Sequence, residues 1–302
     1  MIREFAIEPE VMATWPHFRE IFDDLGVCHG RLAAMYPADW IDRVRRLALS
    51  LSPPVRAAAI AERMRQYPDR FIRAGRAFDK GKDWLANAES HAVAGGFDGV
   101  VARKNPRDKS RVLVAGQFSR SQPPWHVPRQ KKVARDAAAF ARCAALLLAS
   151  SEEIMLVEPN LDASEPRFKD PLMTLLGMRA SGKPWRRCEL HVDRPPNDTA
   201  LENRKYNAQR QLAEVVPTGT TVRLHFWLRK TGGEKLHPRF LLTELGGIQF
   251  DYGLDAGDAP GDTTIVTLMD HDLWQAVRAD YTVPSPSFTI TSDCIVGIVG
   301  QA

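Results

Sequence analysis

Cysteine patterns that bind metals or build disulfide frameworks are absent from this chain of 302 residues. Its four cysteines, Cys28, Cys143, Cys188 and Cys294, lie far apart, and none belongs to a CxxC pair. Zinc sites of the ribbon type need such closely spaced pairs, so we expect no metal site. Scattered cysteines likewise give no indication of a disulfide framework.

Long hydrophobic runs are also missing. The longest, residues 143–149, is far shorter than the roughly 20 residues that a membrane-spanning helix requires. The first residues, MIREFAIEPEV, carry a charge every few positions and contain no apolar stretch of the kind found in signal peptides. We therefore expect a cytoplasmic protein without a membrane partner.

A strong excess of one charge is not present either. The 41 lysines and arginines exceed the 37 aspartates and glutamates by a formal net charge of only +4. A bias this small does not by itself indicate a polyanionic partner. With 44% hydrophobic and 26% charged residues, the composition is that of a globular protein with a buried core.

Basic residues nevertheless concentrate between positions 103 and 132, where Asp108 is the single acidic residue. Two interpretations stay open: a solvated loop, or a strip that contacts the phosphates of DNA or RNA. The residues of this basic strip that we expect to bind nucleic acid are Arg103, Lys104, Arg107, Lys109, Arg120, Arg129, Lys131 and Lys132.

The N-terminal part, residues 1–95, is predicted to be mainly helical. Apolar residues recur at helical spacing at 15–25, 40–49 and 55–67. No catalytic constellation is visible there, so we expect this region to serve in packing or in contact with a partner.

The remainder, residues 96–302, is predicted to be an α/β domain with a mixed sheet flanked by helices. Strands alternate with helices, which is typical of this fold class. We expect strands at 99–102, 111–115, 154–157, 187–192, 221–229, 236–243, 248–252, 263–268 and 287–299. We expect helices at 131–150, 168–178, 198–216 and 272–281.

His237 and Arg239 are the residues most suggestive of chemistry. They lie two positions apart in a predicted strand, so their side chains leave the same face. A guanidinium group offers a fork that matches phosphate oxygens, and an imidazole can act as a nucleophile on phosphorus or as a general acid. The pair is suited to phosphate chemistry; the alternative is a structural network at the edge of a sheet.

The segment around this pair resembles the active-site motif of the phospholipase D superfamily. That motif is His-x-Lys-(x)4-Asp on a strand, followed by a glycine-rich turn and a Gly-Ser-x-Asn segment. Here His237, Arg239 and Glu244 keep the spacing, Leu245-Gly246-Gly247 supplies the turn, and Gly253-Leu254-Asp255 stands near the place of the last segment. The order of elements from about 131 to 281 also matches one lobe of that fold, so the resemblance covers about half of the chain.

The resemblance implies a mechanism without metal or cofactor, in which His237 is the nucleophile and forms a phospho-histidine intermediate. Arg239 would hold the phosphate oxygens, and Glu244 would orient or balance the pair. The chain departs from the family in having Arg239 for lysine, Glu244 for aspartate and Leu254 for serine. The mechanism uses two motifs and this chain has one. A second copy or another subunit must therefore supply the other half, or the site is inactive.

Weaker candidates have competing structural interpretations. Residues 158–162 follow a predicted central strand, where α/β sheets place their sites, but they also fit a turn. Trp125 lies in the basic strip and is either a stacking platform for a base or an anchor in the core. His191 and His225 lie in predicted strands and are expected to be core or edge residues.

Two functions therefore stay open. The first is a phospholipase D-like phosphodiesterase, a nuclease that acts as a homodimer. The second is a non-catalytic subunit of the same fold that binds nucleic acid or a partner protein in a larger complex. By resemblance, either one would belong to a prokaryotic antiviral defence or mobile-element system. An enzyme with a nucleotide cofactor is disfavoured, because the chain has no glycine fingerprint for one.

Overall fold

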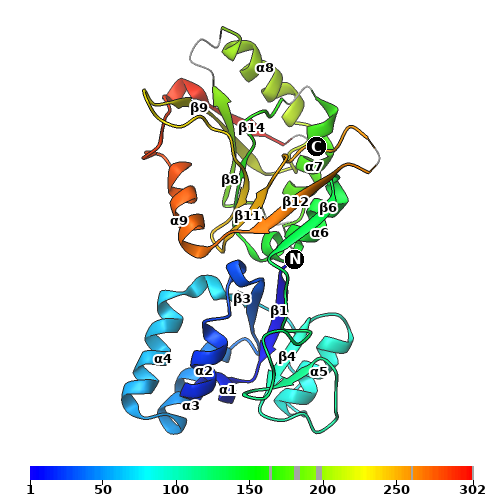
Figure 1. Cartoon of the computed structure of the whole chain (residues 1–302), viewed down its shortest axis with the longest axis vertical. Coiled ribbons are helices and arrows are strands. Elements are labelled where there is room, and N and C mark those ends of the chain that lie inside the picture. The colour runs from blue at the N-terminus through cyan, green and yellow to red at the C-terminus, as the bar shows by residue number, and fades with distance from the viewer. Residues whose placement is uncertain (163–164, 180–183, 195–198, 260, 301–302) are drawn as a thin grey trace. The chain divides into compact units, whose positions relative to one another are not determined.

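The computed structural model describes residues 1–162, 165–179, 184–194, 199–259 and 261–300. The chain divides into two compact units, residues 1–129 and 130–302. Each unit is built around its own sheet (Figure 1). The boundary therefore falls after Arg129 and not after residue 95 as the sequence predicted, because strands at 99–102 and 112–114 pair within the first sheet.

The N-terminal unit contains a parallel sheet of five strands in the order β3-β2-β1-β4-β5. These strands are β1 (Arg3–Ile7), β2 (Arg31–Met35), β3 (Phe71–Arg73), β4 (Gly99–Ala102) and β5 (Val112–Val114). The helices are α1 (Pro9–Ala13), α2 (Trp15–Phe22), α3 (Trp40–Leu51), α4 (Pro54–Gln66) and α5 (Trp84–Val93). The sequence predicted most of these helices, together with β4 and β5.

Both faces of this sheet are buried. On one face Phe5 and Ile7 pack in a core with Phe18, Trp40 and other residues of α1 to α4. On the other face, small residues of β1, β2 and β4 pack with α5. Strands buried on both faces are short apolar runs without alternation, and such runs resemble segments of a buried helix. The region predicted to be mainly helical consequently contains three strands, β1 to β3, that the sequence did not reveal.

The C-terminal unit contains a mixed sheet of nine strands. Its order is β13-β9-β8-β7-β10-β11-β12-β6, with β14 also paired to β9. Strands β7, β8 and β9 are parallel to one another, and the other pairs are antiparallel. The strands are β6 (Gln130–Ala134), β7 (Glu153–Val157), β8 (Arg187–Arg194), β9 (Thr221–Arg229), β10 (Arg239–Leu242), β11 (Gly247–Phe250), β12 (Thr263–Leu268), β13 (Phe288–Thr289) and β14 (Ile295–Val299).

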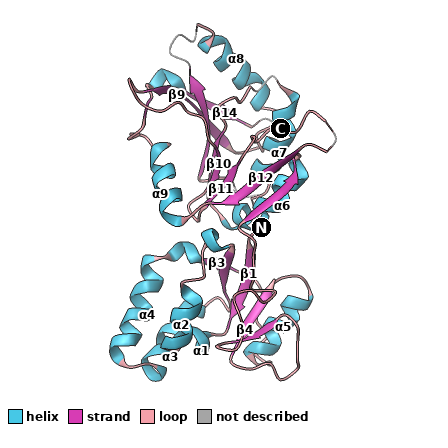
Figure 2. Cartoon of the chain, in the orientation of Figure 1, coloured by secondary structure: helices cyan, strands magenta, loops and turns pink. Residues whose placement is uncertain are grey.

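Helices lie on both sides of this sheet (Figure 2). They are α6 (Ala137–Ser150), α7 (Pro166–Leu176), α8 (Leu201–Leu212) and α9 (His271–Asp280). Helix α6 packs Phe140 against Phe250 of β11, with ring centroids 5.1 Å apart. On the opposite face, Trp274 and Val277 of α9 join a core with Met155 and Trp227.

The predicted alternation of strands and helices in this unit is confirmed, with two corrections. The strand expected at 287–299 is divided into β13 and β14 by a 3-10 turn at Ser292–Cys294. The helix expected at 131–150 begins only at Ala137, because Asp136 caps it by accepting a 2.7 Å hydrogen bond from the amide of Ala139. Lys131 and Lys132 lie instead on the edge strand β6, where charged side chains discourage pairing with another sheet. The expected cap of α8 at Asn197 or Asp198 lies outside the described residues.

Candidate functional site

The start of β10 is the centre of the candidate site. Strand β10 pairs antiparallel with β7 on one side and with β11 on the other, so that Arg239 lies opposite Phe250 and Phe240 opposite Val157. This arrangement brings together the beginning of β10, the residue after β7 and the segment after β11. The motif residues Arg239 and Gly253–Asp255 therefore meet at one end of the sheet.

Glu158 joins these segments. It directly follows β7 and is 3% exposed. Its carboxylate accepts hydrogen bonds from the amides of Leu254 (2.9 Å) and Asn160 (3.2 Å), and Arg239 Nε lies 3.8 Å from Oε1. Burial raises the pKa of Glu158, while the two amides and Arg239 counteract part of that shift. The Gly253–Asp255 segment is thus attached to the end of a central strand.

Asp255 carries the second buried carboxylate of the site. Arg135 Nη2 lies 2.6 Å from Asp255 Oδ1, and Arg167 Nη1 lies 3.4 Å from Oδ2. Arg135 closely precedes α6, and Arg167 lies in the first turn of α7. The amino ends of both helices are therefore at this end of the sheet, and such ends favour negative charge.

Gly253 is required by this geometry. It has a φ of +153°, and a Cβ at this position would lie 2.5 Å from Asp255 Oδ1 and 3.2 Å from Glu158 Oε2. Any side chain would push apart the carboxylates that hold the segment.

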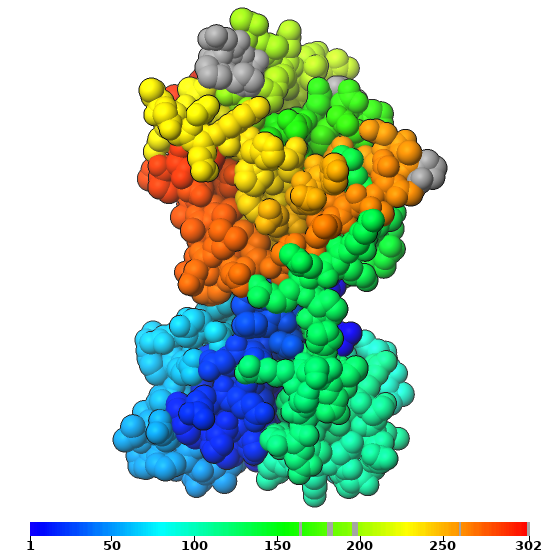
Figure 3. Space-filling view, viewed as in Figure 1, coloured from blue at the N-terminus to red at the C-terminus, as the bar shows by residue number. Residues whose placement is uncertain are grey.

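His237 and Glu244 lie at opposite ends of β10. His237 is exposed and precedes the strand in the surface loop 230–238, which is yellow in Figure 3. Glu244 follows the strand and accepts hydrogen bonds from the amides of Glu152 (2.6 Å) and Glu153 (3.0 Å) at the start of β7. The structure therefore places His237 and Arg239 on the side of the candidate site, and Glu244 in a contact between strands away from it.

The charges of the site suit an anion. Three arginines, Arg135, Arg167 and Arg239, share the two carboxylates of Glu158 and Asp255. The Nε of Arg239 is buried and has no hydrogen-bond partner, and the side chain of Arg167 is 42% exposed. A phosphate group could accept hydrogen bonds from the guanidinium N–H groups that do not contact the two carboxylates.

A pocket of roughly 520 Å³ lies next to this cluster, and Arg135 lines it together with Lys132, Tyr252 and Thr264. Tyr252 is 63% exposed, and the guanidinium carbon of Arg135 lies 5.6 Å from the centre of its ring. An exposed aromatic ring beside basic side chains is the combination on which proteins stack nucleic-acid bases. Sequence reasoning missed Arg135, Arg167 and Tyr252, since only folding brings them to the motif.

The basic strip does not form one free surface. Arg103 pairs with Glu8 at 2.8 Å, Arg120 pairs with Asp24 at 2.9 Å, and Arg107 pairs with Glu89. The remaining members of the strip, Lys104, Lys109, Arg129, Lys131 and Lys132, are exposed as well. Only Lys131 and Lys132 belong to the unit that contains the candidate site.

The other sequence candidates are structural or lie elsewhere. Trp125 is 1% exposed and its indole nitrogen lies 3.3 Å from Asp24 Oδ2, so it anchors the core of the N-terminal unit. His191 and His225 are buried in β8 and β9. Among the residues that the structure describes, no group of histidine, cysteine or acidic side chains is arranged to hold a metal ion. No helix in these same ranges is long and apolar enough to cross a membrane.

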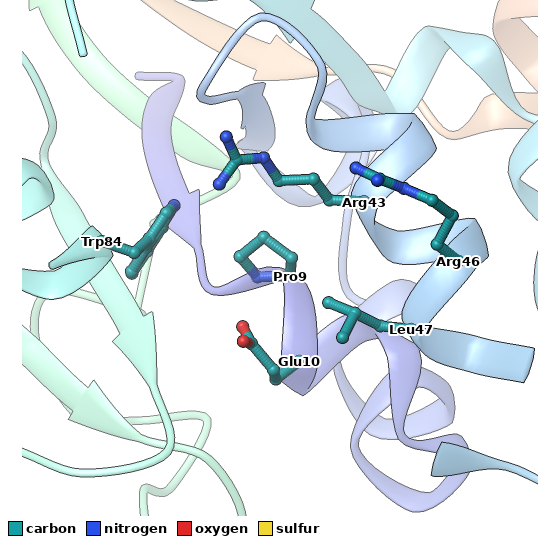
Figure 4. A pocket seen from close by; sticks show the side chains of 6 residues that line it. All are labelled: Pro9, Glu10, Arg43, Arg46, Leu47 and Trp84. Carbon is teal, nitrogen blue, oxygen red and sulfur yellow. The ribbon is translucent and has the colours of Figure 1, made fainter. Parts of the chain in front are cut away.

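The N-terminal unit has a pocket of its own, of roughly 340 Å³ (Figure 4). Trp84 and the α3 residues Arg43 and Arg46 surround Pro9 there. The strand order of this unit changes direction between β1 and β4, where open α/β sheets commonly bind ligands. At the ends of these two strands, the Glu8 carboxylate accepts a 2.7 Å hydrogen bond from the backbone amide of Arg103. Glu8, which follows β1, also pairs with the guanidinium group of Arg103, which follows β4, so the two strand ends are joined by an internal ion pair.

The known proteins compared with this chain resemble it distantly or not at all. No family model matches the sequence, and no curated protein matches it. Among solved structures, polyphosphate kinase from Porphyromonas gingivalis is similar at 13% identity and a TM-score of 0.35, over 62% of this chain and 33% of that one. This chain thus spans about a third of that kinase. The archaeal chromatin protein TrmBL2 is similar at 13% identity and a TM-score of 0.26, over 80% of this chain and 78% of that one.

Proposed function

We propose that the C-terminal unit is one half of a phosphodiesterase site that acts on nucleic acid and that a second subunit completes it. One observation carries this proposal: Glu158 contacts both Arg239 and the Gly253–Asp255 segment at one end of the sheet. The exposed His237 lies at the same end. The resemblance of this segment to the phospholipase D motif supports the same chemistry.

Each residue of the half-site has a defined part. Arg239 and Arg167 donate hydrogen bonds to the non-bridging phosphate oxygens. A ring nitrogen of His237 attacks phosphorus, a phospho-histidine forms, and the bond from phosphorus to one ester oxygen breaks. That leaving oxygen takes a proton from the histidine of the second half-site. Water then attacks the phospho-histidine and releases the phosphate end with His237 restored.

The neighbouring pocket supports nucleic acid as the substrate. Tyr252 offers its exposed ring to a base, and Lys132 is placed to contact a further phosphate. Replacing Tyr252 with alanine should weaken binding of single-stranded oligonucleotides by about tenfold, which corresponds to the loss of one stacked base. Tyr206→Ala is the matched control, because Tyr206 is 57% exposed on α8 and lies away from the pocket.

The test of catalysis is cleavage of labelled DNA and RNA in the presence of EDTA. Wild-type protein should cleave one of them. His237→Ala should lower the rate by roughly a thousandfold or more, as expected for a lost nucleophile. Thr231→Ala, in the same exposed loop, should cleave normally. Cleavage that survives His237→Ala would exclude this mechanism.

A second subunit can be tested by mixing. If the site is shared between two copies, wild-type protein titrated with a large excess of His237→Ala should lose activity, because mixed dimers carry one nucleophile only. Activity that depends only on the amount of wild-type chain would show that each chain works alone or with a different partner.

Binding without cleavage is the second candidate function. Its supporting observation concerns Glu244, which follows β10 at the end away from His237 and Arg239. Its carboxylate accepts hydrogen bonds from the amides of Glu152 and Glu153, so it does not contact the imidazole or guanidinium group of the motif. In this case no nucleic acid is cleaved, binding weakens with added salt, and His237→Ala binds as tightly as the wild type. Arg239→Gln should still weaken binding.

A further inference from the structure

A charged patch lies on the face of the C-terminal sheet opposite the candidate site. The register of β7, β8 and β9 places Glu153 beside Arg187, Glu189 beside Arg223, and His191 beside His225. Apolar residues such as Leu190 alternate with them and face the other side. Helix α9 covers the part of this face around Met155 and Trp227. The charged part lines a pocket of roughly 640 Å³.

The base of this pocket is a chain of polar contacts. The indole N–H of Trp227 donates a 2.8 Å hydrogen bond to Nδ1 of His191. Because an indole only donates, Nδ1 must be unprotonated, and the remaining ring proton of His191 is on Nε2. That nitrogen lies 3.5 Å from Glu189 Oε2, and Arg187 Nη2 lies 2.7 Å from the same oxygen. Burial opposes ionisation of Glu189, but its contacts with His191 and Arg187 prevail and lower its pKa to about 2.

His225 is the side chain in this pocket that lacks partners. It is 3% exposed and lines the pocket, yet neither of its ring nitrogens has a hydrogen-bond partner in the described part of the chain. Its Nε2 lies 3.7 Å from Glu189 Oε1. Burial above all, with smaller contributions from the neighbouring His191 and Arg187, lowers the pKa of His225 to about 3, so the ring is neutral near pH 7 and offers one donor and one acceptor. A buried group left unsatisfied costs about 1–3 kcal/mol, which a bound ligand would recover.

One arginine of the pocket is not neutralised by an acidic side chain of the described residues. Arg187 is paired with Glu189, and Arg186 lies 2.7 Å from Glu153, which Arg278 contacts as well. Arg223 is exposed and forms no ion pair with any residue that the structure describes. An anionic group fits beside Arg223, next to the unsatisfied His225.

We propose that this pocket binds a small phosphate ester of about the size of a nucleoside monophosphate. Arg223 and Arg186 donate to the phosphate oxygens, and His225 pairs with a hydroxyl or N–H group of the same ligand. The volume is within the range of pockets that enclose whole small molecules and exceeds what an inorganic ion needs. Because the pocket and His237 lie on different parts of the sheet, this binding is separate from the proposed cleavage.

Calorimetric titration of the full chain tests the proposal with four probes: AMP, ribose 5-phosphate, adenosine and inorganic phosphate. AMP and ribose 5-phosphate should bind saturably, adenosine should not, and inorganic phosphate should bind more weakly than either ester. Arg223→Gln should weaken binding of AMP by about tenfold, the loss expected for one charged hydrogen bond. Arg142→Gln, an exposed arginine on α6 outside the pocket, should bind AMP as the wild type does.

His225→Leu separates ligand binding from a purely structural role of His225, because the unfolding temperature and the affinity for AMP should change in different ways. Leucine removes a buried unsatisfied group, so the variant should unfold at an equal or higher temperature and yet lose binding of AMP. His237→Ala should bind AMP normally, so failure of the nuclease proposal would not affect this one. The proposal is overturned if no ester binds at millimolar concentration, if adenosine binds as well as AMP, or if Arg223→Gln changes self-association and leaves AMP binding intact.

Discussion

The backbone amide of Leu254 donates a 2.9 Å hydrogen bond to the carboxylate of Glu158, although the two residues are 96 positions apart. The contact ties the segment after β11 to the end of β7. It also keeps Asp255 beside Arg135 and Arg167 and leaves Arg239 near both carboxylates. The geometry of the candidate site therefore depends on one buried acid that is not part of the motif.

Replacement of Glu158 tests that dependence. Glu158→Ala leaves the buried amide of Leu254 and the partly buried amide of Asn160 without an acceptor. A buried amide left unsatisfied costs about 1–3 kcal/mol of unfolding free energy. Glu158→Gln keeps one acceptor oxygen and should lose less. Urea unfolding measures both. Glu214→Ala, an exposed acid, is the control and should unfold like the wild type; an equal loss in control and variant would contradict the assigned role.

Gly253→Ala should disturb the site through its backbone. A methyl group there meets two carboxylates, at a φ that other residues rarely adopt, and strain of this kind costs about 1–3 kcal/mol. We expect a lower urea midpoint and weaker binding of nucleic acid. Gly297→Ala is the matched control, because no atom lies within 4 Å of a Cβ at that position. A Gly253→Ala protein with normal stability and binding would show that the segment adapts.

Glu244 should matter for stability and not for the site. Glu244→Ala removes the acceptor of two amides at the start of β7, so the unfolding free energy should fall by about 1–3 kcal/mol. Nucleic-acid binding of the folded protein should stay unchanged. The reverse pattern, normal stability with lost binding, would return Glu244 to the role that the phospholipase D motif implies.

Acid should destabilise the protein through His225. The folded protein keeps this ring neutral down to a pKa of about 3, whereas the unfolded chain takes up the proton near the ordinary value of 6.5. As the pH falls below that value, the unfolded state binds the extra proton and the free energy of unfolding drops by about 1.4 kcal/mol per pH unit.

Between pH 5 and 6.5 the stability that Glu189 contributes is still present, because it is lost only below the ordinary pKa of 4.5. Burial also lowers the pKa of His29 and of His191, so the difference in slope between the wild type and His225→Gln measures the part that belongs to His225. Urea unfolding of His225→Gln over this range should show a shallower slope than the wild type. His126→Gln, at an exposed histidine, should keep the wild-type slope. Parallel slopes for wild type and His225→Gln would contradict the prediction.

Much of the C-terminal unit could be predicted because its signals are local. Strands such as β9 alternate polar and apolar residues, and helix α9 shows a regular apolar spacing. The strands expected at 236–243 and 248–252, with the turn at 245–247 between them, form the hairpin of β10 and β11.

Other parts of the site and fold could not be predicted. Arg135 and Arg167 reach Asp255 from the starts of two helices, across 120 positions in the case of Arg135. Tyr252 and Lys132 share a pocket because β6 pairs with β12. Such contacts follow from strand pairing over long separations, which no local pattern encodes.

By itself the sequence determined the alternation of strands and helices after residue 130, the phosphate-suited residues at the start of β10 and the lack of cysteine pairs. Only the tertiary structure decided that a parallel sheet lies in the N-terminal unit, that Glu244 serves strand packing and that His225 lies unsatisfied in a pocket. The physical reason is that periodicity reports which face of an element is buried. Partners, charges and cavities depend on which elements become neighbours.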